Sequence, residues 1–161
     1  MGFLKKRREI RIIRKIVLEA VKKDASLDYA DNNLKADKEV VLAAVKQSGF
    51  NLEYADKKLK ADKEIVLVAI KEFGNVLEHA DEKLKADKEV VLVALKDAGA
   101  NLRLVDKKLR ADKKIVLLAV KTYGSALQYA DEKFKADKEV VLAAIIDELK
   151  IIRTSIQRIA E

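Results

Sequence analysis

The hydrophobic pattern of this chain repeats every 25 residues along most of its length. A leucine opens each copy of the same phrase, and these leucines are Leu27, Leu52, Leu77, Leu102 and Leu127. Regular repetition at this period is typical of units that are too small to fold alone and that bury their apolar surface by stacking. The sequence therefore predicts an all-α fold, an α-solenoid of five two-helix repeats over residues 26–147.

The first predicted helix of a repeat is short and amphipathic. In the second copy it covers about residues 51–60 and places Leu52, Ala55 and Leu59 on one face at i, i+3 and i+7. The same helix would set an aspartate four residues before a basic residue, a spacing that favours a weak ion pair. These pairs are Asp31/Lys35, Asp56/Lys60, Asp81/Lys85, Asp106/Arg110 and Asp131/Lys135.

The second predicted helix begins after Asp62, which is a favourable N-cap, and has Glu64 in its first turn. Its run 65–70 is apolar on nearly every side, as expected for a helix that lies between two neighbouring units. We expect it to end at Gly74, in the left-handed conformation that glycine adopts after a helix. Gly49, Gly99 and Gly124 occupy the same position in other copies.

Both ends of the chain depart from the repeat. Residues 1–25 are predicted to form an N-terminal cap helix, and the last helix is expected to continue through 148–161 to about Ala160, all within a single repeat domain over 1–161. Its extension carries a stripe with alternating steps of four and three, namely Ile145, Leu149, Ile152, Ile156 and Ile159. A stripe without a repeat beside it predicts self-association through Ile152, Ile156 and Ile159; the alternative is that the extension folds back as a cap.

Charge is concentrated at the N-terminus. Residues 1–25 carry nine Lys and Arg against three Asp and Glu, whereas the repeats are neutral overall. The basic side chains Lys5, Lys6, Arg7, Arg8 and Arg11 form a candidate contact with an anionic membrane or with nucleic-acid phosphates. The alternative is a solvated outer face of a cap helix. No aromatic side chains are interleaved with these charges, which argues against specific readout of nucleic acid.

Composition excludes several kinds of site. The chain has no cysteine, so it has neither disulfides nor a cysteine metal site, and a reducing, cytoplasmic compartment suits it. His79 is the only histidine and has no partner at ligand spacing. The longest apolar run, from Val140 to Ile146, is far shorter than the ~20 residues of a membrane span. We therefore expect no enzyme activity, no metal, no cofactor and no small-molecule substrate.

Two rows of repeated positions are candidate partner-binding surfaces. The first, called the ladder here, contains Tyr29, Tyr54, His79, Leu104 and Tyr129. The second, called the loop edge, flanks the glycines and offers the aromatic residues Phe50, Phe73 and Tyr123. Packing between repeats is the alternative for the ladder, and filling of gaps between helix ends is the alternative for the loop edge.

The phrases Asp37-Lys-Glu-Val-Val-Leu-Ala-Ala-Val-Lys-Gln-Ser-Gly49 and Leu52-Glu-Tyr-Ala-Asp56 resemble a family of short tandem repeats. That family is catalogued only as a domain of unknown function, and its units read roughly Asp-Arg-Glu-Val-Val-Leu-Ala-Ala-Val-Lys-Gln-Asn-Gly. The resemblance covers residues 26–147. Lysine replaces the usual arginine after the aspartate, and the end helices have no counterpart. The resemblance implies an architecture and assigns no site.

These features favour a non-enzymatic scaffold that binds protein partners through its repeats. An engineered or consensus-derived repeat protein without a biological function is one alternative, because the repeats are uniform and lack Cys, Pro and Trp. A peripheral membrane or nucleic-acid binder that acts through the basic N-terminal helix is another.

Overall fold

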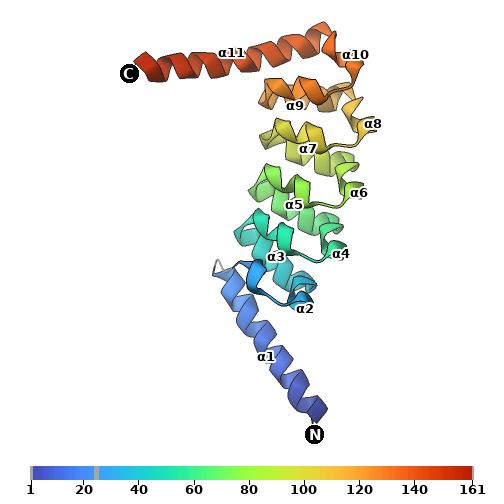
Figure 1. The fold of residues 1–161 in the computed structure, drawn as a ribbon, viewed down its shortest axis with the longest axis vertical. Helices are drawn as coiled ribbons and strands as arrows, with labels where there is room; N and C mark the ends of the chain where they lie inside the picture. Colours follow the sequence, from blue (N-terminus) through green and yellow to red (C-terminus); the bar gives the residue numbers. More distant parts are fainter. Residues whose placement is uncertain (1, 24–25, 161) are drawn as a thin grey trace. The chain divides into compact units, whose positions relative to one another are not determined.

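Each repeat folds into a 3₁₀-helix, a one-turn α-helix and a longer α-helix in the computed structural model (Figure 1). The structure describes the backbone of residues 2–23 and 26–160 and the side chains of 8–23 and 26–159. Within these ranges no residue lies in a strand, and the helical segments recur in tandem. The prediction of an all-α solenoid is confirmed.

The helical segments recur with the 25-residue period of the sequence. The α-helices are α1 Gly2–Lys22, α2 Asn32–Lys35, α3 Lys38–Gln47, α4 Lys57–Lys60, α5 Lys63–Glu72, α6 Glu82–Lys85, α7 Lys88–Asp97, α8 Lys107–Arg110, α9 Lys113–Thr122, α10 Glu132–Lys135 and α11 Lys138–Ala160. The 3₁₀-helices are η1 Leu27–Tyr29, η2 Gly49–Tyr54, η3 Gly74–His79, η4 Gly99–Leu104 and η5 Gly124–Tyr129.

The prediction of one helix over residues 51–60 is wrong. The backbone is 3₁₀-helical to Tyr54, turns extended at Ala55 and starts a separate one-turn α-helix after Asp56. The Asp56 carboxylate accepts a hydrogen bond from the Lys58 N–H at 2.9 Å. An aspartate that caps a helix needs an extended backbone, so it interrupts the longer helix that periodicity alone suggests. The carboxylate predicted to pair with Lys60 is therefore an N-cap.

The longer helix follows the prediction at its start. The Asp62 carboxylate accepts hydrogen bonds from the backbone N–H groups of Glu64 and Ile65, at 3.0 and 3.4 Å. Asp37, Asp87, Asp112 and Asp137 cap the corresponding helices in the same way. The predicted breaks at Ala36, Ala61, Ala86, Ala111 and Ala136 separate these helices from the one-turn helices before them.

The longer helices end just before the glycines, as predicted, but the left-handed conformation predicted for the glycines is wrong. Each of the four begins a 3₁₀-helix, whose φ is negative, and none of Gly49, Gly99 and Gly124 is left-handed. Close packing is the reason for glycine instead. A Cβ on Gly49 would overlap the carbonyl oxygen of Ala69 in the next repeat, and a Cβ on Gly124 would lie 2.5 Å from the carbonyl oxygen of Ala144.

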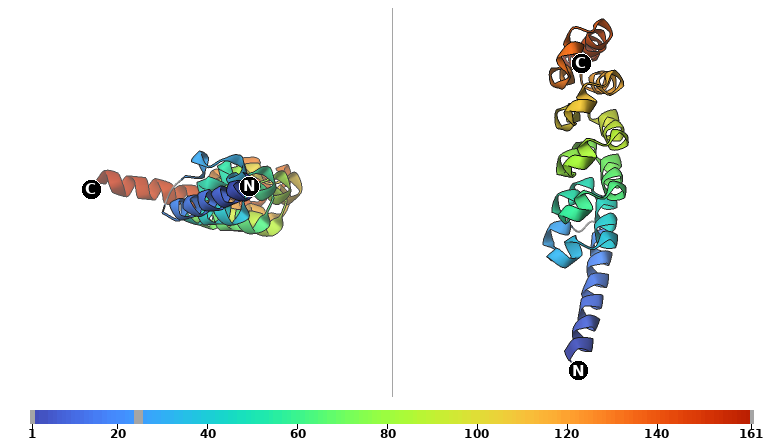
Figure 2. Two further views of the ribbon diagram at one scale, coloured as in Figure 1. Left: turned by 90° about the horizontal axis from the view of Figure 1, so that it is seen from below. Right: turned by 90° about the vertical axis from the view of Figure 1, so that its right-hand side faces the viewer.

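The chain divides into two compact units, Met1–Asp81 and Glu82–Glu161. In the first unit α1 packs on α3 and α3 packs on α5; in the second, α7 packs on α9 and α9 packs on α11. Within each unit the one-turn helices lie along one edge, with the longer helices stacked beside them (Figures 1 and 2). The core consists of the repeated apolar positions, illustrated by Leu52, Ile65, Val66, Ala69 and Ile70, all 0% exposed.

Backbone hydrogen bonds join the one-turn helices of successive repeats. The N–H of Asp56 donates to the carbonyl of Lys35 at 2.9 Å, and that of Asp81 donates to Lys60 at 3.0 Å. In the second unit Asp106 and Asp131 donate to Lys85 and Arg110, both at 3.1 Å. A single helical turn is too short to be stable in water, so these bonds from the next repeat supply support that the turn lacks by itself.

Both end helices outrun the repeats as predicted. α1 is 21 residues long and α11 is 23, whereas the repeat helices between them have ten. In Figure 1 each of these two helices extends beyond the body of its own unit. None of the described helices has both the length and the hydropathy that crossing a membrane requires.

Candidate interaction surfaces

Ion pairs link successive repeats within each unit, and the sequence had not predicted them. The ammonium of Lys38, the first residue of α3, lies 2.7 Å from Asp62 and 2.8 Å from Glu64 at the start of α5. Lys113 contacts Asp137 and Glu139 in the same way, and Lys88 lies 2.6 Å from Asp112. We call these contacts the clamps. The recurrence of Asp-Lys-Glu at the repeat period is the signal that would have revealed them.

The clamps change the titration of the capping aspartates. Hydrogen bonding to the lysine ammonium holds the pKa of Asp62, Asp112 and Asp137 below the usual value for a carboxyl group, and the backbone N–H donors add to this effect. The same contacts raise the pKa of Lys38 and Lys113. Each of these aspartates is therefore an ion-pair partner and a helix cap at once, and its charge is used structurally.

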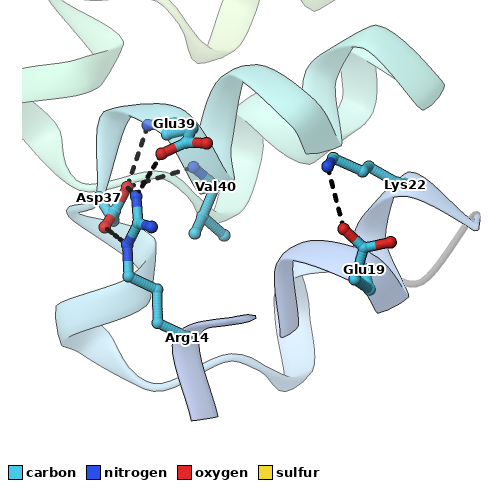
Figure 3. Close-up of polar contacts among 6 residues, drawn as sticks. All are labelled: Arg14, Glu19, Lys22, Asp37, Glu39 and Val40. Carbon is cyan, nitrogen blue, oxygen red and sulfur yellow. Dashed lines mark hydrogen bonds and ion pairs between the residues drawn. The ribbon is translucent and has the colours of Figure 1, made fainter. Parts of the chain in front are cut away.

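An arginine provides the equivalent contact for the N-terminal helix (Figure 3). Arg14 Nε lies 2.6 Å from Asp37 Oδ2, and its Nη2 lies 2.6 Å from Glu39 Oε2. Asp37 also accepts hydrogen bonds from the N–H groups of Glu39 and Val40 at the start of α3. The Arg14 guanidinium lowers the pKa of Asp37. Arg14 thus anchors α1 to the first full repeat.

A buried amide joins two repeats in the first unit. Asn51 is 7% exposed, its Oδ1 accepts a hydrogen bond from the Leu27 N–H at 2.8 Å, and its Nδ2 donates to the Ala44 carbonyl at 3.0 Å. Buried backbone groups need such partners. The sequence did not reveal this role of Asn51, because its hydrogen-bond partners, Leu27 and Ala44, lie 24 and 7 residues away in the chain.

The ladder residues differ in their exposure. Tyr29 is 91% exposed, whereas Tyr54, His79, Leu104 and Tyr129 are half-buried. The negative charge of Glu53, together with burial, raises the pKa of Tyr54. His79 Nε2 lies 3.8 Å from the carboxylate of Glu78. The structure therefore places four ladder side chains partly inside the stack and leaves Tyr29 in solvent.

Two aromatic residues of the loop edge form a pair. The rings of Phe50 and Phe73 lie 5.1 Å apart between centroids and are inclined by 35°. The two residues are 46% and 47% exposed, so the pair is open to solvent on one side. Tyr123, at the position of Phe73 two repeats later, is 39% exposed. The loop edge thus presents a preformed aromatic surface in the first unit.

The N-terminal helix is amphipathic along its described part. Arg8, Arg11 and Lys15 are exposed on one side, and Ile10 and Ile13, 57% and 51% exposed, lie on the opposite side of the helix. The predicted contact residues Lys5, Lys6 and Arg7 lie outside the residues whose side chains are described. Basic and apolar groups are therefore both available on α1.

The predicted self-association stripe is open to solvent. Ile152, Ile156 and Ile159 are 53%, 61% and 86% exposed, and every described side chain from 151 onward is exposed. The extension is a continuation of α11 and does not fold back as a cap on its own unit. Among the described residues no group of three or more His, Cys, Asp or Glu is placed to hold a metal ion.

The comparisons with known proteins give one match. The family model described as "Domain of unknown function (DUF4116)" matches residues 13–60, 62–110 and 112–152, which together cover most of the chain. No curated protein and no solved structure matches the sequence. The family model covers the five repeats and also reaches into both end helices, which the resemblance in the sequence had left without a counterpart.

Proposed function

We propose a function for a chain that belongs to the DUF4116 family: it is a non-enzymatic interaction scaffold that binds a protein partner along the loop edge. The observation that carries this proposal is the exposed pair of Phe50 and Phe73. Aromatic rings are common anchors of protein interfaces, because they bury a large apolar area and lose little conformational entropy on binding.

The surroundings of the pair support this role. Phe73 directly follows α5 and Phe50 lies in η2, and the backbone of both segments is fixed by capping and by packing between repeats. A partner would therefore meet rings that are already positioned, which reduces the ordering cost of binding. Hydrogen-bonded ion pairs with Arg14 or with a lysine of the preceding repeat lower the pKa of Asp37, Asp62, Asp112 and Asp137, so these carboxylates have a structural use that requires no substrate.

A double variant, Phe50→Ser with Phe73→Ser, tests the proposal against a matched control, Tyr29→Ser, which removes an exposed ring from the ladder. Covalent cross-linking in the source cells should yield a partner with the intact chain and with the control, and should lose it with the double variant. Equal capture by all three proteins would contradict the proposal. If the chain is an engineered protein without a biological partner, we expect that outcome, or no specific capture at all.

The loss of the partner must be separated from a loss of folding. Because both rings are about half-exposed, the double variant should keep the repeat helices, as measured by circular dichroism and by the midpoint of thermal unfolding. If the double variant instead unfolds at a much lower temperature than the control, the rings serve packing between helix ends and the loop edge is not the binding surface.

A second candidate function rests on the amphipathic character of α1. Exposed Arg8, Arg11 and Lys15 on one side and exposed Ile10 and Ile13 on the opposite side would suit a helix that lies on an anionic membrane. Binding to phosphatidylserine vesicles should fall steeply with salt, and deletion of residues 1–9 should remove most of it. Strong, salt-sensitive binding after the deletion would place the electrostatic surface elsewhere. Equal affinity for duplex DNA would instead favour a phosphate contact.

A further inference from the structure

The long helix of the last repeat exposes an apolar position that its counterparts bury. Leu95 in α7 and Val120 in α9 are 0% exposed, whereas Ile145 at the same position in α11 is 49% exposed. Within the second unit α9 packs on α7, and α11 packs on α9. Ile145 therefore lies on the face of α11 that corresponds to the face on which α7 and α9 each receive a neighbour.

This exposed face continues along the extension of α11 without interruption. Its apolar residues, 49% to 86% exposed, are Leu142, Ile145, Leu149, Ile152, Ile156 and Ile159. They alternate in steps of three and four, which is the spacing of a coiled-coil heptad. Leu142, Leu149 and Ile156 then occupy a positions, and Ile145, Ile152 and Ile159 occupy d positions. The stripe has the pattern of one helix in a coiled coil rather than of a repeat helix.

The length of the stripe indicates which helix could cover it. From Leu142 to Ile159 it spans about 26 Å at 1.5 Å per residue. A repeat helix has ten residues, about 15 Å, and would leave the second half of the stripe uncovered. A second α11, with 23 residues and the same stripe, would cover all of it.

Charges beside the stripe favour parallel pairing of two α11 helices. Glu148 is at a g position and Arg153 is at the e position of the following heptad, which are the sites that face each other between parallel helices in register. Glu148 is held at the edge of the stripe, where it accepts a hydrogen bond from the Ser125 hydroxyl at 2.7 Å. In an antiparallel pair, g positions face g positions and this charge pairing is lost.

A substitution within the repeat pattern widens the same surface. Ile146 is 46% exposed and occupies an e position, where each preceding repeat helix has a lysine. Those lysines are Lys46, Lys71, Lys96 and Lys121. Replacing the lysine with isoleucine removes a positive charge from the edge of the stripe and extends its apolar area. Both changes favour burial of this surface against another helix.

We propose that copies of this chain associate through α11, in a parallel, in-register coiled coil in which Glu148 pairs with Arg153 of the second copy. The inference goes beyond the proposed partner-binding function, because it uses α11 and leaves the loop edge free. Leucine at a and isoleucine at d shift parallel coiled coils toward three or four strands, so we expect three or four copies in the assembly, with each Glu148 paired to Arg153 of a neighbouring copy.

Cysteine cross-linking tests the register directly, because the chain has no cysteine of its own. Ile159→Cys and Ile152→Cys should each form an intermolecular disulfide under mild oxidation, since equivalent d positions meet in a parallel pair. Thr154→Cys, on the outer face of α11, is the matched control and should remain monomeric on a non-reducing gel. Cross-linking at Thr154 as readily as at Ile159, or at neither d position, would overturn the proposal.

Sedimentation equilibrium at tens of micromolar gives the independent test. The intact protein should be an oligomer, and the double variant Ile152→Lys, Ile156→Lys should be a monomer whose repeats melt at an unchanged temperature.

Charge reversal tests the parallel orientation. Glu148→Arg or Arg153→Glu alone should weaken association by about tenfold or more, and the two together should restore it. A monomeric intact chain, or charge reversals without rescue, would contradict the parallel pairing. Capture of a partner through Phe50 and Phe73 would be unaffected by either result.

Discussion

The helices α9 and α11 begin alike and end in different environments. Val116 and Val120 of α9 are 0% exposed, whereas Val141 and Ile145, at the same positions in α11, are half-buried and 49% exposed. Both helices start after a capping aspartate and present nearly the same apolar residues. The difference shows that burial in this fold depends on the neighbouring repeat and is not encoded in the helix alone, as expected when stability arises at interfaces between units.

The largest expected effect is a difference between two equivalent core positions. Leu95→Ala removes a side chain with no exposed surface and should lower the free energy of unfolding by about 2–5 kcal/mol. Ile145→Ala, made in the Ile152→Lys, Ile156→Lys background so that α11 is unpaired, should cost less than about 1 kcal/mol. Urea unfolding followed by circular dichroism measures both values. Equal losses would mean that Ile145 is as well covered as Leu95, and the contrast between α11 and the repeat helices before it would fail.

The glycine position offers the next contrast. A Cβ on Gly99 would overlap the carbonyl oxygen of Ala119 and lie 2.5 Å from the Thr122 hydroxyl. Gly99→Ala should therefore destabilise the fold by about 1–3 kcal/mol through overpacking. Leu149 stands at the corresponding position after the last repeat and is 57% exposed, so Leu149→Ala in the same unpaired background should have little effect. A stabilising Gly99→Ala variant would show that only backbone entropy, and not the close approach, decides this position.

The buried amide should have an effect of similar size. Asn51→Leu leaves the Leu27 N–H and the Ala44 carbonyl without their partner, and we expect a loss of about 1–3 kcal/mol. The next repeat has Val76 at this position, fully buried, so an apolar side chain is compatible with the site in another context. Asn75→Leu, an exposed asparagine in η3, is the matched control. Unfolding midpoints that agree within error for the two variants would argue that water replaces the amide.

The sequence alone was sufficient to predict the 25-residue period, the helix starts at Asp62 and its equivalents, and the long end helices. These features depend on local chemistry, namely apolar spacing and N-capping, which short stretches of sequence contain. The sequence was insufficient to predict the structure of residues 51–60. Periodicity indicates one continuous helix there, but the Asp56 side chain binds backbone N–H groups and starts a new helix instead. Two aspartates six residues apart, Asp56 and Asp62, are the signal of two helix starts.

Other features depend on contacts between residues far apart in the chain. Gly49 is needed because Ala69, twenty residues later, approaches its backbone, and no local rule distinguishes this role from that of a helix stop. Lys38 reaches Asp62 across 24 residues, so the clamps become visible only when repeats are stacked. The exposed pair of Phe50 and Phe73 was among the predicted surface residues, but its ring contact follows from the fold.

The clamps give the smallest expected effect, and it depends on pH. In the folded chain Lys113 lowers the pKa of Asp137, so the folded-state pKa lies below the unfolded value of about 3.9. The contact therefore contributes stability that is fully present above about pH 4 and is lost as the pH falls through the folded pKa. In Lys113→Met the decrease in the urea midpoint between neutral pH and acid should be smaller than in the intact chain, and added salt should reduce the difference.

Lys114→Met, a change at the next residue, which is exposed, is the control and should keep the full decrease. If Lys113→Met and the intact chain lose stability in parallel as the pH falls, the ion pairs between repeats make no measurable contribution in water, and the backbone N–H donors alone lower the pKa of the capping aspartates.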